Sequence, residues 1–250
     1  MILLLLLLVL PAVVLGAISQ RVTGMGFALV VAPLLVLLLD PLAAVIIVNL
    51  CGAASAIVIG LRMRAHVDWG RFFWLAAPAL IGVIPGTWLL LVLSRGVLEV
   101  VLGALLLVAL TVSLLVHRTT FMLDGPAPRL IAGFSSGLMN SAAGVGGPAA
   151  TTYAVLSRWH QQSFAATMQP YLLTIASASL LSKYVMAPGE WPIFDWWLWL
   201  GVVASLVVGL IVGERISPHV DARLARVIVV VIAYAGATLA VVKGATGWPR

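Results

Sequence analysis

Two stretches of the chain combine glycines with amide and hydroxyl side chains, a pattern that can bind an anion. They cover residues 20–26 and 140–148, and an apolar run follows each. Glycine lets the backbone approach a solute, and a helix that starts there presents free N–H groups and positive partial charge. We therefore expect an anion site between the stretches. Its candidate residues are Gln20, Arg21, Thr23, Gly24, Gly26, Asn140, Ser141, Gly144, Gly146 and Gly147.

Each candidate has a purely structural alternative. Single glycines are also typical of close helix packing in membranes, although that does not explain the amides and hydroxyls beside them. Arg21 either supplies the positive charge of the site or extends to the cytoplasmic surface as a topology signal. Asn49 and Gln169 lie deep in apolar segments, where they either complete the same cavity or bond between helices.

The chain shows no catalytic or metal-binding pattern. All eight carboxylates, Glu99 among them, lie near the ends of apolar segments, and the four histidines are scattered. No nucleophile stands in a recognisable motif, and Cys51 is the only cysteine. We expect neither an enzyme nor a bound cofactor or metal, and no buried acid for a proton relay or a sodium site.

The composition predicts a membrane protein. The 250 residues are 63% hydrophobic and 9% charged, with a mean hydropathy of +1.18, whereas soluble domains carry about 25% charged residues. The net charge of +6 is explained by basic cytoplasmic loops, so no nucleic-acid partner is expected. The expected partners are a small anionic substrate and membrane lipid, and a homo-oligomer stays open.

The apolar runs divide into five segments that occur twice in a single membrane domain, residues 1–250. The first repeat covers residues 1–118 and the second residues 127–245, joined by a linker at 124–128. The predicted segments are 2–18, 27–39, 41–61, 72–93 and 97–116, then 130–139, 148–156, 163–186, 197–213 and 222–242. The sequence therefore predicts an all-α, polytopic protein.

The two halves share spacing as well as composition. A shift of 120 positions places Gln20 on Asn140, Asn49 on Gln169, and the paired glycines of the first stretch on those of the second. A shift of 127 superimposes these pairs: Asp68 and Trp69 on Asp195 and Trp196, Gly82 on Gly209, and Gly86 on Gly213. An odd number of segments makes the second repeat inverted, as in many transporters.

The second segment of each half is too short to cross a bilayer. At 1.5 Å per residue, 27–39 and 148–156 give helices of about 20 Å and 14 Å, against a hydrocarbon core of about 30 Å. We expect hairpins that enter the membrane and return, with tips at residues 19–26 and 140–147 that meet near the midplane. Alternatively, the preceding segments span the membrane fully.

The basic residues predict the orientation. With the loop that carries Arg62, Arg64 and Arg71 inside, ten of the fourteen basic residues fall towards the cytoplasm. Lys183 and Lys243 fall outside, together with Glu99, and both termini lie outside. We expect a multi-pass protein of the bacterial cell (inner) membrane.

These motifs resemble the TauE/SafE family of membrane permeases, often called sulfite exporters. The resemblance is carried by Gly24, Met25 and Gly26 with Pro33, by 133–137 and 144–148, by Val67, Asp68 and Trp69, and by Gly82 and Gly86. It implies transport of sulfite, sulfoacetate or related organosulfonates.

The residues and the resemblance together predict an exporter that binds a small anion between the two tips and works by alternating access. With no intramembrane acid, we expect uniport or a proton carried by the substrate itself. Two rivals stay open: an anion channel with the same site, and a membrane scaffold or assembly factor that transports nothing.

Overall fold

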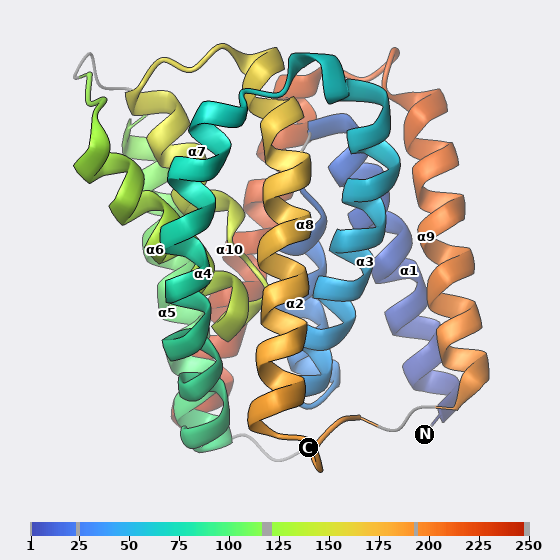
Figure 1. Cartoon of the computed structure of the whole chain (residues 1–250). Coiled ribbons are helices and arrows are strands. Elements are labelled where there is room, and N and C mark those ends of the chain that lie inside the picture. Colours follow the sequence, from blue (N-terminus) through green and yellow to red (C-terminus); the bar gives the residue numbers. More distant parts are fainter. Residues whose placement is uncertain (1, 24–25, 117–121, 193–194, 248–250) are drawn as a thin grey trace.

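The computed structural model describes residues 2–23, 26–116, 122–192 and 195–247, and in these ranges the protein is entirely helical (Figure 1). All ten predicted segments form helices, which confirms the all-α prediction. The elements are α1 (Ile2–Thr23), α2 (Gly26–Leu38), α3 (Pro41–Met63), η1 (Arg64–His66), α4 (Trp69–Val92), α5 (Arg95–Val116), α6 (Pro126–Ala143), α7 (Gly147–Leu156), α8 (Gln161–Met186), α9 (Trp196–Ile216) and α10 (Ala222–Thr246).

Six helices in the described ranges are long and apolar enough to cross a membrane, and their outer faces suit lipid. On α4 the exposed side chains include Phe73, Ile81, Ile84 and Trp88, which share one face of the helix. Large apolar side chains facing outwards are costly in water and favourable in a bilayer. This multi-pass architecture confirms the prediction of a membrane protein.

Helices α6 and α7 form the hairpin expected in the second half. The N–H of Leu123, before α6, donates to the carbonyl of Leu156, at the end of α7, at 3.0 Å. The hairpin therefore enters and leaves on the same side. With 10 residues, α7 is about 15 Å long and covers only half of a bilayer core.

The predicted tips are wider than the observed bends. Gln20 and Arg21 lie in the last turns of α1, and Asn140 and Ser141 lie in α6. The backbone leaves the helix at Gly144, whose φ of +75° is left-handed and strained for other residue types. With 22 residues, α1 is about 33 Å long and could span a membrane, which is the alternative the sequence left open.

Glycines pack α4 onto α6 and α9 onto α1 through equivalent positions. A Cβ on Gly82 would collide with the carbonyl oxygen of Phe134, and one on Gly209 would lie 2.7 Å from the carbonyl oxygen of Val14. One turn later, Gly86 packs closely against Ser141 on α6, and Gly213 packs closely against Arg21 on α1. These partners are related by the offsets of 120 and 127, so the contacts support the repeat, whose inverted symmetry stays a prediction.

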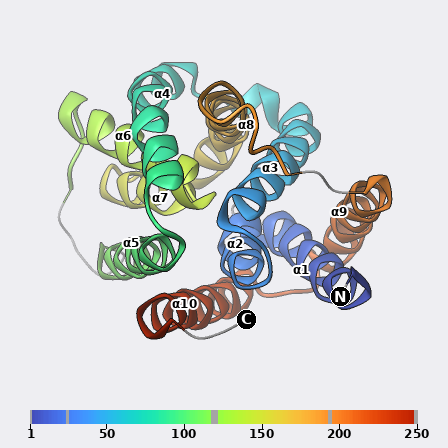
Figure 2. The same ribbon diagram turned by 90° about the horizontal axis from the view of Figure 1, so that it is seen from below.

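The arrangement of the helices follows the same pairing (Figure 2). Helices α4 and α6 lie on one side and α1 and α9 on the other, while α3 packs against α8 and α5 against α10. Helix α1 begins and α10 ends at the same end of the bundle (Figure 1).

Candidate functional site

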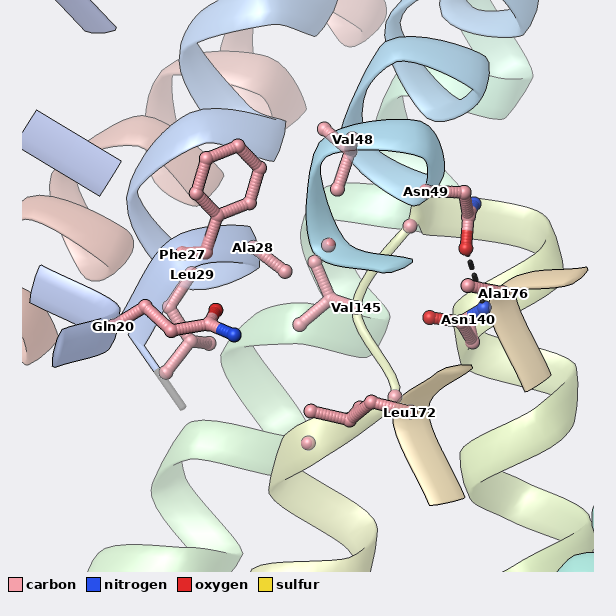
Figure 3. A pocket seen from close by; sticks show the side chains of 14 residues that line it. Gln20, Phe27, Ala28, Leu29, Val48, Asn49, Asn140, Val145, Leu172 and Ala176 are labelled. Atoms are coloured by element: carbon pink, nitrogen blue, oxygen red, sulfur yellow. Dashed lines mark hydrogen bonds between the residues drawn. The ribbon is translucent and has the colours of Figure 1, made fainter. Parts of the chain in front are cut away.

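A pocket lies where the end of α1, the first turn of α2 and the bend between α6 and α7 face α3 and α8 (Figure 3). Both glycine stretches contribute to its wall, as the sequence predicts. Its lining residues are Gln20, Phe27, Ala28, Leu29, Val48, Asn49, Gly52, Asn140, Gly144, Val145, Gly146, Gly147, Leu172 and Ala176. The wall is thus mostly apolar, with three amide side chains and a glycine-rich backbone.

The first turns of α2 and α7 both face this pocket. Phe27, Ala28 and Leu29 follow the start of α2 at Gly26, and Gly146 and Gly147 form the start of α7. No side chain caps the first N–H groups of α7, so they are available to a solute. Two helix N-termini add positive partial charge, which favours an anion.

Asn49 and Asn140 connect α3 to α6 at the pocket wall. The side-chain amide of Asn140 donates to the Asn49 side-chain oxygen at 2.7 Å (Figure 3), and Asn49 Nδ2 donates to the carbonyl of Val45 at 2.9 Å. Both side chains are almost completely buried. Because Asn49 is anchored to its own helix, the pair holds Asn140 in one orientation at the edge of the pocket.

Gln20 contributes a donor that has no partner among the described residues. Its side chain is 3% exposed, and Nε2 makes no hydrogen bond. Figure 3 shows its amide turned inwards, towards Val145. A buried donor without a partner carries an energetic penalty that a bound acceptor oxygen removes. Gln20 is therefore well placed to bind a solute oxygen.

The pocket is small and its lining is uncharged. Its volume is about 30 Å³. One water needs about 10–15 Å³ of such volume, so the pocket holds about two or three waters. Among the described residues, no group of three or more His, Cys, Asp or Glu side chains could hold a metal ion. The donors on its wall are backbone N–H groups and amides.

Six of the predicted site residues, Gly26 and Ser141 among them, lie away from this pocket or cannot be placed in it. Arg21 forms an ion pair with Glu214 at 3.6 Å, with a third of its side chain exposed. Gln169 donates to the carbonyl of Ala165 and packs against Gly60 on α3. Gly24 lies outside the described residues, and the side chain of Thr23, the last residue of α1, is likewise not described.

Ser141 does not line the pocket and instead contacts Lys183, a residue predicted to lie on the outer side of the membrane. Lys183 is 1% exposed, and its Nζ donates to the Ser141 carbonyl at 2.8 Å and to the Ser179 hydroxyl at 2.7 Å. The side of the membrane assigned to Lys183 stays a prediction; its burial was not predicted, because it lies three residues before the end of α8, a position typical of snorkelling. The sequence feature that could have indicated its burial is a single basic residue within an apolar segment.

The prediction that no acid is buried was wrong. Glu99 is 4% exposed and forms an ion pair with Lys243 at 3.4 Å. Glycines allow this burial, because Gly244 on α10 approaches the backbone of Gly96 on α5 closely. Glu99 does not line the pocket, so it offers no relay to a bound solute.

An ionic cluster fastens the entry of the second hairpin, within the predicted linker. Asp124 accepts hydrogen bonds from Tyr153 at 2.8 Å and from Arg129 at 2.9 Å, and Arg71 lies 3.8 Å away. The Tyr153 hydroxyl is the main cause that lowers the pKa of Asp124 to about 2. The cluster joins the start of α6 to α7 and α4, and so holds the base of the hairpin.

These features define a multi-pass membrane protein with a small, donor-lined pocket in its interior. The profile of the family described as sulfite exporter TauE/SafE matches residues 8–239, and the chain belongs to this family. The match covers both glycine stretches and confirms the resemblance found in the sequence. No curated protein and no solved structure matches the chain.

Proposed function

We propose that the protein exports a small oxyanion, either sulfite or an organosulfonate such as sulfoacetate, and binds it in the pocket between the hairpin tips. One observation carries the proposal: the first turns of α2 and α7 line the same pocket, beside the partnerless amide of Gln20. The membership of a sulfite exporter family supports the same class of solute.

The donors suit an oxyanion better than a cation. The N–H groups at the start of α7, which no side chain caps, and Gln20 Nε2 can both donate hydrogen bonds to a solute, and no carboxylate lines the pocket. Helix N-termini add positive potential without a formal charge. Binding through dipoles lets the anion leave again, because no opposite unit charge on the wall holds it.

The size of the pocket favours the smaller solutes of this class. Space for about two or three waters admits a compact group such as the SO₃ head of sulfite. Sulfoacetate carries a carboxylate on a methylene group as well, so the pocket has to widen towards one side before it binds. We therefore propose sulfite as the first solute to test.

Two related hairpins on either side of one site suit alternating access. The equivalent glycine contacts of α4 with α6 and of α9 with α1 allow each hairpin to move with its own partner helix. We propose that the end bearing Arg62, Arg71 and Arg129 faces the cytoplasm. A membrane potential that is negative inside then favours export by about 2.3 kcal/mol per charge per 100 mV.

Counterflow of radiolabelled sulfite in proteoliposomes tests the proposal. We expect saturable exchange that the Asn140→Ala variant reduces at least tenfold while the protein stays folded. A channel gives no counterflow, because solute does not return bound to a carrier. A scaffold gives no sulfite flux above empty liposomes, and either result would overturn the proposal.

A further inference from the structure

Lys183 is a buried basic residue next to the pocket, and its hydrogen-bond partners among the described residues are neutral oxygens. Its Nζ donates to the Ser141 carbonyl at 2.8 Å, the Ser141 hydroxyl at 3.1 Å and the Ser179 hydroxyl at 2.7 Å. Ser141 in turn shares a hydrogen bond of 2.6 Å with Thr87 on α4. Three helices, α4, α6 and α8, thus surround this ammonium group.

Among the described residues, no carboxylate forms an ion pair with Lys183. Lys243, by contrast, has Glu99 beside it. Burying a cation without an opposite charge is unfavourable even when hydrogen bonds are made, and such groups in membrane segments commonly serve ions or substrates. The missing negative charge is the observation that points to a ligand.

The position of Lys183 connects it to the pocket by two routes. Asn140 and Ser141 are neighbours on α6, and Asn140 lines the pocket while Ser141 binds Lys183. On α8, Leu172 and Ala176 line the pocket, and Ser179 and Lys183 continue the same helical face at spacings of three and four. This face leads from the pocket towards the end of α8 that precedes α9.

In the first half, the position equivalent to Ser141, which contacts Lys183, carries a basic residue, Arg21. An offset of 120 superimposes Ser141 on Arg21, and an offset of 127 superimposes Thr87 on Glu214. Ser141 and Thr87 share a hydrogen bond. Arg21 and Glu214 form an ion pair at 3.6 Å. Arg21 is partly exposed and paired with an acid, whereas the cation at Ser141 is buried and lacks one.

We propose that Lys183 supplies the positive charge that balances the anion in the pocket, acting from behind the wall formed by Asn140 and Ser141. This inference rests on the proposed anion site. Lys183 is then a positioning residue that lies between the pocket and the end of α8 that precedes α9. Its charge lowers the energy of the bound anion, and the anion in turn balances the charge of the buried ammonium group. The hydroxyls of Ser179 and Ser141 hold Nζ in place.

The Lys183→Met variant separates this role from a structural one. Replacing a buried cation by an apolar side chain of similar length is commonly neutral or stabilising, so we expect unfolding of the solute-free protein at an equal or higher temperature. Sulfite affinity can be measured in detergent from the rise in unfolding temperature that sulfite causes. We expect this affinity to fall by about tenfold, because that is the effect of one unit charge acting over several ångströms at an effective dielectric constant of about 20.

Three further variants complete the test. Lys183→Gln keeps hydrogen bonding without the charge and should lose affinity equally, whereas Lys183→Arg should recover most of it. Arg95→Met removes a cation that pairs with Asp40 outside the pocket and should leave affinity unchanged. If Lys183→Met fails to fold, the Gln variant decides the question by the same affinity measurement.

The outcomes distinguish this inference from the proposed function. If wild-type protein is stabilised by sulfite and Lys183→Gln is stabilised to the same extent, the proposed function stands and the role of Lys183 is structural. If neither sulfite nor sulfoacetate stabilises the wild-type protein, the anion site itself is wrong. A loss of affinity in Arg95→Met as large as in Lys183→Met would show a general effect of net charge, and would also overturn the inference.

Discussion

The side-chain amide of Asn140 donates to the side-chain oxygen of Asn49 at 2.7 Å, and this bond joins the second hairpin to α3 at the pocket wall. Both residues are buried, so each depends on the other to avoid an unpaired polar group. The pair therefore couples the end of α6 to the helix beside it, and it fixes the orientation of the Asn140 amide at the pocket wall.

A double-mutant cycle should detect this coupling. We expect Asn49→Ala to lower the free energy of unfolding by about 1–3 kcal/mol, because the buried Asn140 amide loses its acceptor. Asn49→Ala with Asn140→Ala should cost less than the sum of the two single changes, by about 0.5–3 kcal/mol. Denaturation in detergent measures all four proteins, and strict additivity would contradict the coupling.

Gln20→Leu should separate stability from binding. The buried Nε2 has no partner in the part of the chain that the structure describes, so its removal should leave the unfolding temperature unchanged or raise it. Sulfite affinity should fall, by about tenfold for a hydrogen bond to a charged acceptor. The control is Thr111→Val, which removes an exposed hydroxyl on α5. A Gln20 variant that is less stable but binds sulfite normally would show that the side chain is purely structural.

The close helix approaches predict a matched effect in the two halves. Gly82→Ala and Gly209→Ala each place a Cβ against the backbone of the partner helix, and we expect each to destabilise the protein by about 1–3 kcal/mol. Gly189→Ala meets no atom within 4 Å and should be neutral. Thermal unfolding of the three variants checks this. If only one of the two core changes destabilises, the packing of the halves is not equivalent.

The Asp124 cluster predicts a loss of stability in acid. Because the folded protein holds the pKa of Asp124 at about 2, below its ordinary 3.8, the ionised group stabilises the fold at pH values above about 4. That contribution should disappear as the pH falls from about 4 through 2. The difference in unfolding temperature between wild-type protein and Asp124→Asn should shrink over this interval. A difference that does not change with pH would contradict the linkage.

The proposed orientation can be tested by labelling in whole cells. In a Cys51→Ala background, Gly189→Cys lies in the loop between α8 and α9 and should react with a membrane-impermeant thiol reagent. His66→Cys, in η1 on the opposite side, should react only after the cells are permeabilised. The reverse pattern would place both termini in the cytoplasm and would reverse the direction that we infer from the basic residues.

Local sequence determined the helices and the two glycine-containing stretches. Apolar length and breaks at charges and glycines are properties of short segments, and they placed all ten helices to within a few residues. The glycines at 144–147 predicted the bend for the same reason, since backbone freedom is local. The lengths of α2 and α7 likewise indicated that neither can span a membrane alone.

Only the tertiary structure decided which side chains face the pocket. Neighbours on a helix point about 100° apart, so Asn140 reaches the pocket while Ser141 binds Lys183, and Gln20 lines it while Arg21 pairs with Glu214. The rotation of each helix about its axis is set by contacts between distant segments, such as Gly82 against Phe134. Burial of Lys183 has the same origin, because it depends on α4 and α6 closing over the end of α8.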